Sequence, residues 1–198
     1  MTTLILASTS SARIALLRGA GLSFEAVGAD VDERALEEPL LAAGATPAEV
    51  ADALAQAKAL AVSRRRPDAL VIGGDQVLDL AGERFVKPDG RAGAKAQLAR
   101  LSGRTHHLRS AVALARGGAI SWRHLASASL TLRPLDGEAL DRYLDRAGDA
   151  VTRSVGAYQL EGIGIQLFER IEGDYFTILG LPLLPLLAAL RGEGLVLP

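Results

Sequence analysis

The chain has 198 residues, of which 49% are hydrophobic and 23% charged, and its formal net charge at pH 7 is -1. This composition can supply a core, and the length suits one large domain or two lobes that share a cleft. The charge balance disfavours a non-specific nucleic-acid binder, which usually carries a strong basic excess. The absence of cysteine excludes disulfides, thiolate metal sites and cysteine nucleophiles.

We expect a soluble, cytoplasmic protein with no membrane partner. The first residues, Met1–Ala7, lack the positive segment and the long apolar run of a signal peptide. Near the other end, the apolar stretch 178–190 is 13 residues long and holds two prolines. A stretch of this length is too short to span a bilayer.

The first predicted elements are a buried strand at residues 4–7, a hydroxyl-rich loop at residues 8–11, and a helix that ends at Gly19 or Gly21. The free N–H groups and the dipole of a helix start favour an anion, which Arg13 could bind through two hydrogen bonds. The alternative is an ordinary serine N-cap. The loop lacks the Gly-x-x-x-x-Gly-Lys-Ser/Thr pattern, so it is not a Walker nucleotide site.

Acidic residues follow a second predicted strand at residues 24–27. The loop at residues 30–33 holds three carboxylates, which could bind a hard cation such as Mg²⁺. Such a run is more often a solvated turn. The next motif, Thr46-Pro47-Ala48-Glu49, predicts a helix start with a capping box. This helix should run to about Arg65 and carries Lys58 in its middle, where a lysine is usually a surface residue.

The prediction of the functional site depends mainly on residues 69–76. The apolar run Ala69–Ile72 is typical of a buried strand, and Gly73, Gly74 and Asp75 follow it. In open α/β sheets, ligands bind outside the carboxyl ends of the strands, and glycines there allow close approach to the backbone. Asp75 is therefore predicted just past a strand end, where a general base or a metal ligand is needed. The alternative is a plain Gly-Gly-Asp-Gln turn.

The middle of the chain predicts extended structure around a helix at residues 93–101. Before this helix, Lys87 precedes a proline, which holds its backbone extended. After it, residues 106–115 and 120–132 predict a long β-hairpin with a turn at residues 116–119. The adjacent His106 and His107 should point to opposite faces of the first strand, so we interpret both as structural.

The C-terminal third predicts a helix from Asp136 to about Ala147, and then a glycine-rich loop at residues 155–165 that turns into a strand. Glu172–Tyr175 should precede a last strand, and Pro182 should open a helix through Leu190. The alternation of strands and helices, together with the hairpin, predicts an α/β fold: a mixed twisted sheet with flanking helices.

In this order, the motifs resemble those of the Maf family of nucleoside triphosphate pyrophosphatases, once described as septum-formation inhibitors. The resemblance runs from Leu4 to about Arg191 and implies a single Maf-like domain over residues 1–198, with two lobes around a central cleft. Each motif is weak alone, but their order and spacing are specific. The motifs are Leu6–Arg13, Asp32-Glu33, Ala57-Lys58-Ala59, Ile72–Gln76, Lys87-Pro88, Leu101–His106, Gly156-Ala157-Tyr158, Glu172–Tyr175 and Gly180-Leu181-Pro182.

The resemblance implies cleavage of a nucleoside triphosphate to its monophosphate and pyrophosphate, assisted by a divalent cation (Mg, Mn or Co). Asp75 would be the catalytic carboxylate, taking a proton from the attacking water or holding the metal, and Glu33 would share that metal. A triphosphate carries about four negative charges, which must be screened before water can approach phosphorus. The side chains implied to bind phosphate are Ser8, Ser10, Arg13, Lys58 and Lys87.

Three positions where the chain departs from the commonest family pattern bear on the choice of base. These positions are Ala12, Gln76 and Glu161. Gln76 and Glu161 resemble the branch that acts on 7-methyl-GTP, and Ala12 matches neither that branch nor the dTTP/UTP branch well. A 7-methyl-GTP-like substrate is therefore the first expectation, and dTTP or UTP is the alternative.

Two other classes of function stay open. A non-catalytic regulator of cell division or septum formation could keep the fold and a nucleotide pocket, but the retained Asp75, Lys58 and Lys87 count against it. A nucleic-acid-binding module is disfavoured by the charge balance and by only 4% aromatic residues. We expect a nucleoside triphosphate as the bound partner and no nucleic acid, and we leave a homodimer open.

Overall fold

The computed structural model describes residues 2–197, so Met1 and Pro198, the ends of the predicted domain, lie outside it. The chain forms two compact units. The first comprises Met1–Gln76, Arg109–Ala126 and Tyr175–Pro198, and the second comprises Val77–Leu108 and Ser127–Asp174. The single domain over residues 1–198 stays a prediction.

One mixed seven-stranded sheet is formed within residues 2–197, and the predicted α/β class is confirmed. The strand order is β2-β1-β3-β5-β6-β7, and β4 also pairs with β3. β1 is parallel to β2 and β3, whereas β4 and β7 are antiparallel to β3 and β6. The strands are β1 (Leu4–Leu6), β2 (Glu25–Ala26), β3 (Leu70–Leu80), β4 (Glu83–Phe85), β5 (Thr105–Arg116), β6 (Ala119–Leu132) and β7 (Phe168–Glu172).

All five predicted helices are confirmed, with ends that differ by a few residues. The capping box of α3 is present, since Thr46 and Glu49 each accept a hydrogen bond from the other's backbone N–H. Asp136 caps α5 by accepting from Ala139 N at 2.7 Å. The helices are α1 (Ser11–Gly19), α2 (Glu33–Ala42), α3 (Pro47–Arg65), α4 (Gly90–Leu101), α5 (Gly137–Ala147), α6 (Tyr175–Ile178) and α7 (Leu183–Gly192), with 3-10 turns η1 (Gly148–Thr152), η2 (Val155–Ala157) and η3 (Ile163–Leu167).

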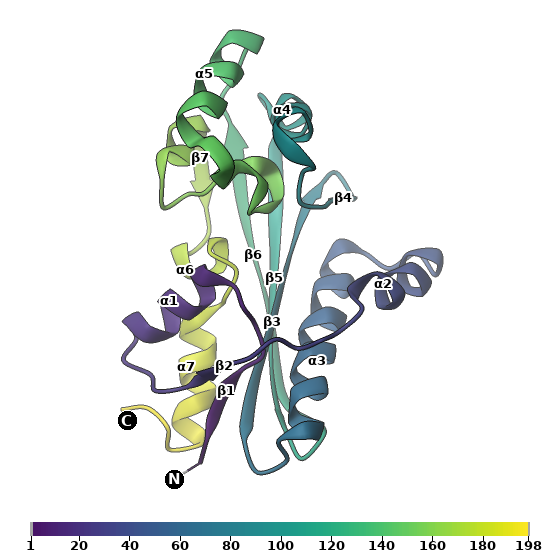
Figure 1. Cartoon of the computed structure of the whole chain (residues 1–198), viewed down its shortest axis with the longest axis vertical. Coiled ribbons are helices and arrows are strands. Elements are labelled where there is room, and N and C mark those ends of the chain that lie inside the picture. Colours follow the sequence, from purple (N-terminus) through teal and green to yellow (C-terminus); the bar gives the residue numbers. More distant parts are fainter. Residues whose placement is uncertain (1, 198) are drawn as a thin grey trace. The chain divides into compact units, whose positions relative to one another are not determined.

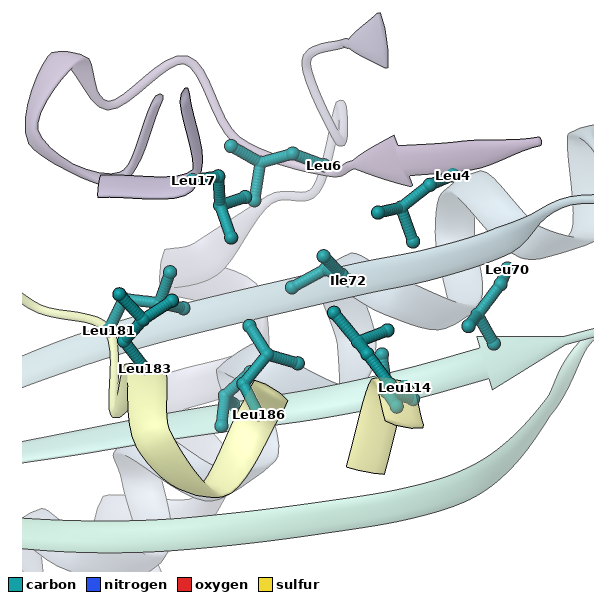
Figure 2. Close-up of a cluster of buried hydrophobic side chains, with 11 residues drawn as sticks. Leu4, Leu6, Leu17, Leu70, Ile72, Leu114, Leu181, Leu183 and Leu186 are labelled. Carbon is teal, nitrogen blue, oxygen red and sulfur yellow. The ribbon is translucent and has the colours of Figure 1, made fainter. Parts of the chain in front are cut away.

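In the first unit, helices cover both faces of the sheet, with α1 and α7 on one face and α3 on the other (Figure 1). Successive residues of a strand point to opposite faces, so each strand contributes to both layers. On the α3 face, Ile5 and Val71 pack with Val62. Figure 2 shows much of the other layer, which contains Leu4, Leu6, Leu17, Leu70, Ile72, Leu114, Leu181, Leu183 and Leu186.

The second unit is organised around the packing of α4 with α5 and with the 3-10 turns. On β5, His106 is fully buried and its Nε2 lies 2.7 Å from the Tyr158 hydroxyl. Burial lowers the pKa of His106 to about 4, so its ring is neutral at pH 7. His107 instead pairs its Nδ1 with Ser129 Oγ at 2.9 Å. The structural interpretation of both histidines is confirmed by these contacts.

The main departure from the sequence prediction is at residues 73–76. β3 runs without a break from Leu70 to Leu80, so Asp75 lies inside the strand. Both the strand end and the turn predicted there were therefore wrong. The glycines serve close packing: a Cβ at Gly73 would lie 2.2 Å from Ala55 O, and one at Gly74 would lie 3.3 Å from Arg13 Nε. Glycine within a strand marks such an approach as well as a turn.

Two further regions differ from the prediction. The acidic loop leads into the helix α2, whose N-cap is Asp32. The sequence pattern did not predict this helix, because a proline within it is typical of a helix break. After β7 the chain forms the short helix α6 rather than a last strand. The predicted loop-to-strand stretch 155–165 holds the turns η2 and η3, and β7 begins only at Phe168. Within the described range 2–197, no helix is both long and apolar enough to cross a membrane.

We predict that Gly73→Ala destabilises the first unit by at least about 2 kcal/mol, because the new methyl group would collide with the backbone of α3. Gly74→Ala is the matched control, and we expect it to cost less than about 1 kcal/mol, since its methyl group would meet the side chain of Arg13 at 3.3 Å. Urea denaturation of the parent and both variants measures the difference. Equal stability of the two variants would contradict the assignment.

Candidate active site

The predicted catalytic carboxylate belongs to a contiguous charged cluster in the first unit. Lys58 Nζ lies 2.6 Å from Asp75 Oδ1 and 2.7 Å from Glu33 Oε1, so one ammonium group bridges two carboxylates. The side chains of Asp75 and Lys58 are only 10% and 11% exposed, whereas that of Glu33 is 51% exposed. The cluster joins β3, α3 and the first residue of α2, and it reaches solvent at Glu33.

The structure explains why Lys58 is not a surface lysine. Gly73 brings α3 against β3, and the Asp75 side chain leaves the strand two residues further on, on the same face. Lys58 lies one residue before Ala59, whose backbone nitrogen would be 2.6 Å from a Cβ at Gly73. The lysine therefore extends along the strand to the carboxylate instead of into water.

Burial raises the pKa of the Asp75 carboxyl above its ordinary value, although the positive charges of Lys58 and Arg13 act in the opposite direction. The negative charge of Glu33 adds a smaller upward effect. For Arg13, burial lowers the pKa and the two carboxylates partly offset this effect. Burial favours the protonated form of this acid and the neighbouring cations favour its ionised form, so its proton affinity depends on the balance between them. A carboxylate in such surroundings is a candidate general base.

The three predicted phosphate ligands near the chain start are gathered at the N-terminus of α1. Arg13 is buried, and it donates from Nε to Gly180 O at 2.8 Å and from Nη1 to Ser8 Oγ at 3.3 Å. Ser10 caps the helix by accepting from Arg13 N at 3.5 Å, which confirms the N-cap alternative. Anion binding at the same helix start stays a prediction, and the cap does not exclude it.

The residues predicted to select the base have different surroundings. Ala12 lies in the first turn of α1 and is half-buried. Gln76 follows Asp75 on β3, and its Nε2 donates to Ser110 Oγ at 2.8 Å and to the carbonyls of Thr177 and Ile178, both at 3.0 Å. Sequence reasoning missed Ser110 and these carbonyls. The Gly180-Leu181-Pro182 motif was the one signal that the segment after α6 matters.

Lys87 and Glu161 both belong to the second unit. Lys87 is exposed in the segment between β4 and α4, next to a buried proline, and its extended backbone stays a prediction. Glu161 is exposed in the turn before η3. Their roles toward a nucleotide bound at Asp75 stay predictions. The other predicted residues, Ser8, Ser10, Ala12, Arg13, Glu33, Lys58, Asp75 and Gln76, all lie in the first unit.

A hollow of about 370 Å³ on the first unit contains none of the predicted site residues. It is lined by the start of α3 and by β6, and its charged groups include the ion pair of Arg123 with Asp52, 2.6 Å apart. The paired charges leave no chemical reason to move the candidate site there. The candidate site is instead the charged cluster with the start of α1.

Asp75 and Glu33 have the donor chemistry for a divalent cation. Both carboxylates contact the same lysine nitrogen, and each uses only one of its oxygens to do so. Within residues 2–197 there is no group of three or more His, Asp or Glu side chains suited to a metal. Mg²⁺ commonly binds through one or two carboxylates together with substrate phosphates and water, so two carboxylates suffice for that class of site.

We predict opposite effects of two substitutions on the pKa of Asp75. Lys58→Met removes the nearest positive charge and should raise this pKa further, whereas Glu33→Gln removes a negative charge and should lower it. The parent carboxyl already ionises above the pH expected for a free aspartate. A titration of the Asp75 carboxyl carbon by NMR measures all three midpoints. Shifts of the same sign in both variants would rule out this electrostatic account.

Comparison with known proteins gives the family of the chain. A family model described as Maf-like protein matches residues 3–193. The chain is 57% identical over 190 residues to the 7-methyl-GTP pyrophosphatase of Brucella abortus biovar 1 (strain 9-941), covering 96% of each chain. It is 57% identical over 193 residues to the 7-methyl-GTP pyrophosphatase of Rhizobium meliloti (strain 1021), covering 98% of this chain and 97% of the relative. It is 54% identical over 194 residues to the nucleoside triphosphate pyrophosphatase of Nitrobacter hamburgensis, covering 98% and 95%. Because the family model spans nearly the whole chain and the relatives align over almost their full length, this chain belongs to the Maf family.

Proposed function

We propose that this chain hydrolyses a nucleoside triphosphate to its monophosphate and pyrophosphate. The observation that carries the proposal is the buried Asp75 carboxylate, which is paired with Lys58 and lies within electrostatic reach of Arg13, in a chain that is 54–57% identical to the pyrophosphatases compared above. A buried acid flanked by two cations matches the needs of this reaction. The attacking water must lose a proton, and the negative charge on the departing pyrophosphate must be stabilised.

Each side chain of the cluster has capacity left for a triphosphate. Lys58 has three N–H donors, and Asp75 and Glu33 use two, which leaves one for a phosphate oxygen. Arg13 has five, of which one on Nε and one on Nη1 are used. Asp75 then accepts a proton from the water that attacks at the anhydride bond between the α- and β-phosphates. Lys58 and Arg13 stabilise the negative charge that develops on the departing pyrophosphate.

A divalent cation (Mg, Mn or Co) belongs to this proposal, held by Asp75 and Glu33. When bound, such a cation neutralises phosphate charge and polarises the phosphoryl oxygens. We also propose that the substrate is a free cytoplasmic nucleotide rather than a nucleic acid, in keeping with the net charge of -1.

The direct test is a pyrophosphate-release screen over ordinary and modified nucleoside triphosphates, with and without EDTA. Release that stops with EDTA and returns with excess Mg²⁺ or Mn²⁺ supports the proposal in full. Nucleotide binding without release, at any metal concentration, would favour the regulatory alternative instead.

We predict that Asp75→Asn abolishes turnover while the fold survives. The amide is nearly isosteric but can neither accept the proton nor hold a cation as a carboxylate does. Pyrophosphate release measures turnover, and circular dichroism with thermal unfolding checks the fold. Asp52→Asn is the matched control, because Asp52 is an ion-paired acid of the same unit outside the cluster. Turnover of Asp75→Asn near the parent rate would refute the assignment.

For the base, we propose a preference for 7-methyl-GTP over dTTP and UTP. Methylation at N7 puts a positive charge on guanine, which a carboxylate attracts. A carboxylate can also accept hydrogen bonds from the guanine N1–H and 2-amino groups, whereas uracil and thymine present carbonyl acceptors that it repels. Glu161 is exposed in its turn and therefore open to such a contact. The names of the Brucella and Rhizobium relatives support the same base.

We predict that Glu161→Gln narrows or reverses this preference by about 1–3 kcal/mol, the range expected for one charged contact in a partly wet pocket. The ratio of kcat/KM values on 7-methyl-GTP, dTTP and UTP, before and after the substitution, measures it. Glu169→Gln, at another exposed acid of the second unit, is the control and should leave the ratio unchanged. A parent enzyme that favours dTTP or UTP, unaffected by Glu161→Gln, would defeat the proposal.

A further inference from the structure

Gln97 of α4 links two segments of the second unit that belong to different sequence motifs. Its Nε2 donates to Val86 O at 2.7 Å, and its Oε1 accepts from Gly156 N at 3.1 Å. A carbonyl only accepts and a backbone N–H only donates, so these two partners fix the orientation of the amide. Val86 directly precedes Lys87, and Gly156 opens the Gly156-Ala157-Tyr158 motif.

The Gly156 end of this link is held in place by packing. Gly156 has a φ of 83°, a left-handed conformation that favours glycine. A Cβ at this position would lie 2.7 Å from both Leu78 Cδ1 and Tyr158 Cε1, so these two side chains confine the turn. The turn therefore offers Gln97 a fixed donor, and the nitrogen of the Gln97 amide points to Val86 as a result.

One face of α4 contacts the segment between β4 and α4 at several places. Gly93, Gln97 and Arg100 are spaced i, i+4 and i+7, which puts them on the same face of the helix. A Cβ at Gly93 would lie 3.6 Å from Pro88 Cβ. Arg100 lies over the ring of Phe85, with its Cζ 4.5 Å from the ring centroid. The helix thus holds this segment on both sides of the residues that Gln97 reaches.

The residues between these two contacts are Val86 and Lys87. Both are exposed, whereas Phe85 before them and Pro88 after them are buried. The proline restricts the backbone of Lys87, but it does not fix the peptide on the other side of that residue. The hydrogen bond from Gln97 is made to the carbonyl of that peptide. Its loss would free the exposed pair to move between two fixed ends, and the Lys87 ammonium group would move with it.

We infer that Gln97 is a positioning residue for Lys87, acting through the Val86 carbonyl. The inference rests on the proposed function, because it takes Lys87 to be a phosphate ligand of that site. A positioning role predicts a loss that is common to all nucleotides, since every nucleoside triphosphate presents the same phosphates. It also predicts that the loss disappears once the Lys87 ammonium group is removed. A direct contact of Gln97 with the nucleotide would instead persist without that group.

The test compares Gln97→Met, which keeps the length of the side chain but removes the amide, in the parent and in a Lys87→Met background. In the parent, kcat/KM should fall about 5- to 50-fold and by the same factor on 7-methyl-GTP, GTP, dTTP and UTP, because a phosphate ligand is displaced. In the Lys87→Met background, the same change should cost less than about 2-fold, because no ammonium group remains to be positioned. Gln56→Met is the matched control, since Gln56 donates to Asp52 on α3, and it should leave kcat/KM unchanged.

A second readout does not depend on catalysis. The NMR order parameter of the Lys87 backbone N–H should be about 0.85 in the parent and in Gln56→Met, and it should fall below about 0.6 in Gln97→Met. If Gln97→Met folds poorly, Gln97→Glu gives the same test at pH 8, because a carboxylate can accept from Gly156 N but cannot donate to Val86 O. In Gln97→Glu the Lys87 order parameter should fall, while hydrogen exchange of the Gly156 amide stays parent-like.

The two readouts separate this inference from the proposed function. A parent that releases no pyrophosphate would defeat the proposed function, and the order parameters would still decide whether Gln97 holds Lys87 in place. A base-selective loss, an equal loss in both backgrounds, or an unchanged Lys87 order parameter would overturn the inference.

Discussion

The close approach of α3 to β3 is the constraint on which the candidate site depends. It is set by Gly73, where any Cβ would meet the backbone of α3 at 2.2 Å. At this separation Lys58 reaches Asp75 at 2.6 Å while both side chains are almost fully buried. A charge pair at this depth loses much of its hydration, and removing one partner leaves the other uncompensated. Small residues on the surface of α3 that faces β3, such as Ala55 and Ala59, are also needed for this close approach.

Opposing electrostatic effects act on the pKa of Asp75 in this site. Burial raises the pKa of Asp75, and the neighbouring cations lower it, so its proton affinity is set by the balance. Glu33, whose side chain is half-exposed, pairs with the same Lys58 ammonium group from the solvent-facing side of the cluster. The spare donors on Lys58 and Arg13 suit a polyanion, which a passive nucleotide binder would also need. A buried acid beside those donors weakens the binding of an anion and has a chemical use only if it takes a proton during turnover, which is the physical reason to prefer an enzyme.

The second unit carries the predicted residues that are most exposed. Lys87 lies in the segment after β4 and Glu161 lies in a turn, and both side chains are exposed. By contrast, His106 and Tyr158 of the same unit are buried and form a hydrogen-bonded pair. This unit therefore places the two charged residues on its surface, and their roles toward a nucleotide stay predictions.

The sequence alone determined the α/β class, the capped helices α1, α3 and α5, the β5–β6 hairpin, and the identity of the charged residues, because caps, turns and periodicity are local signals. It misplaced the strand around Asp75, because a Gly-Gly-Asp-Gln stretch has the same local propensity in a turn and in a strand packed against a helix. It also missed α2 and α6, in which local signals are interrupted or very short. Only the tertiary structure decided that Lys58 is buried against Asp75 and that Gln76 and Arg13 hold one turn, since the chain separates these partners by 17 and by more than 100 residues.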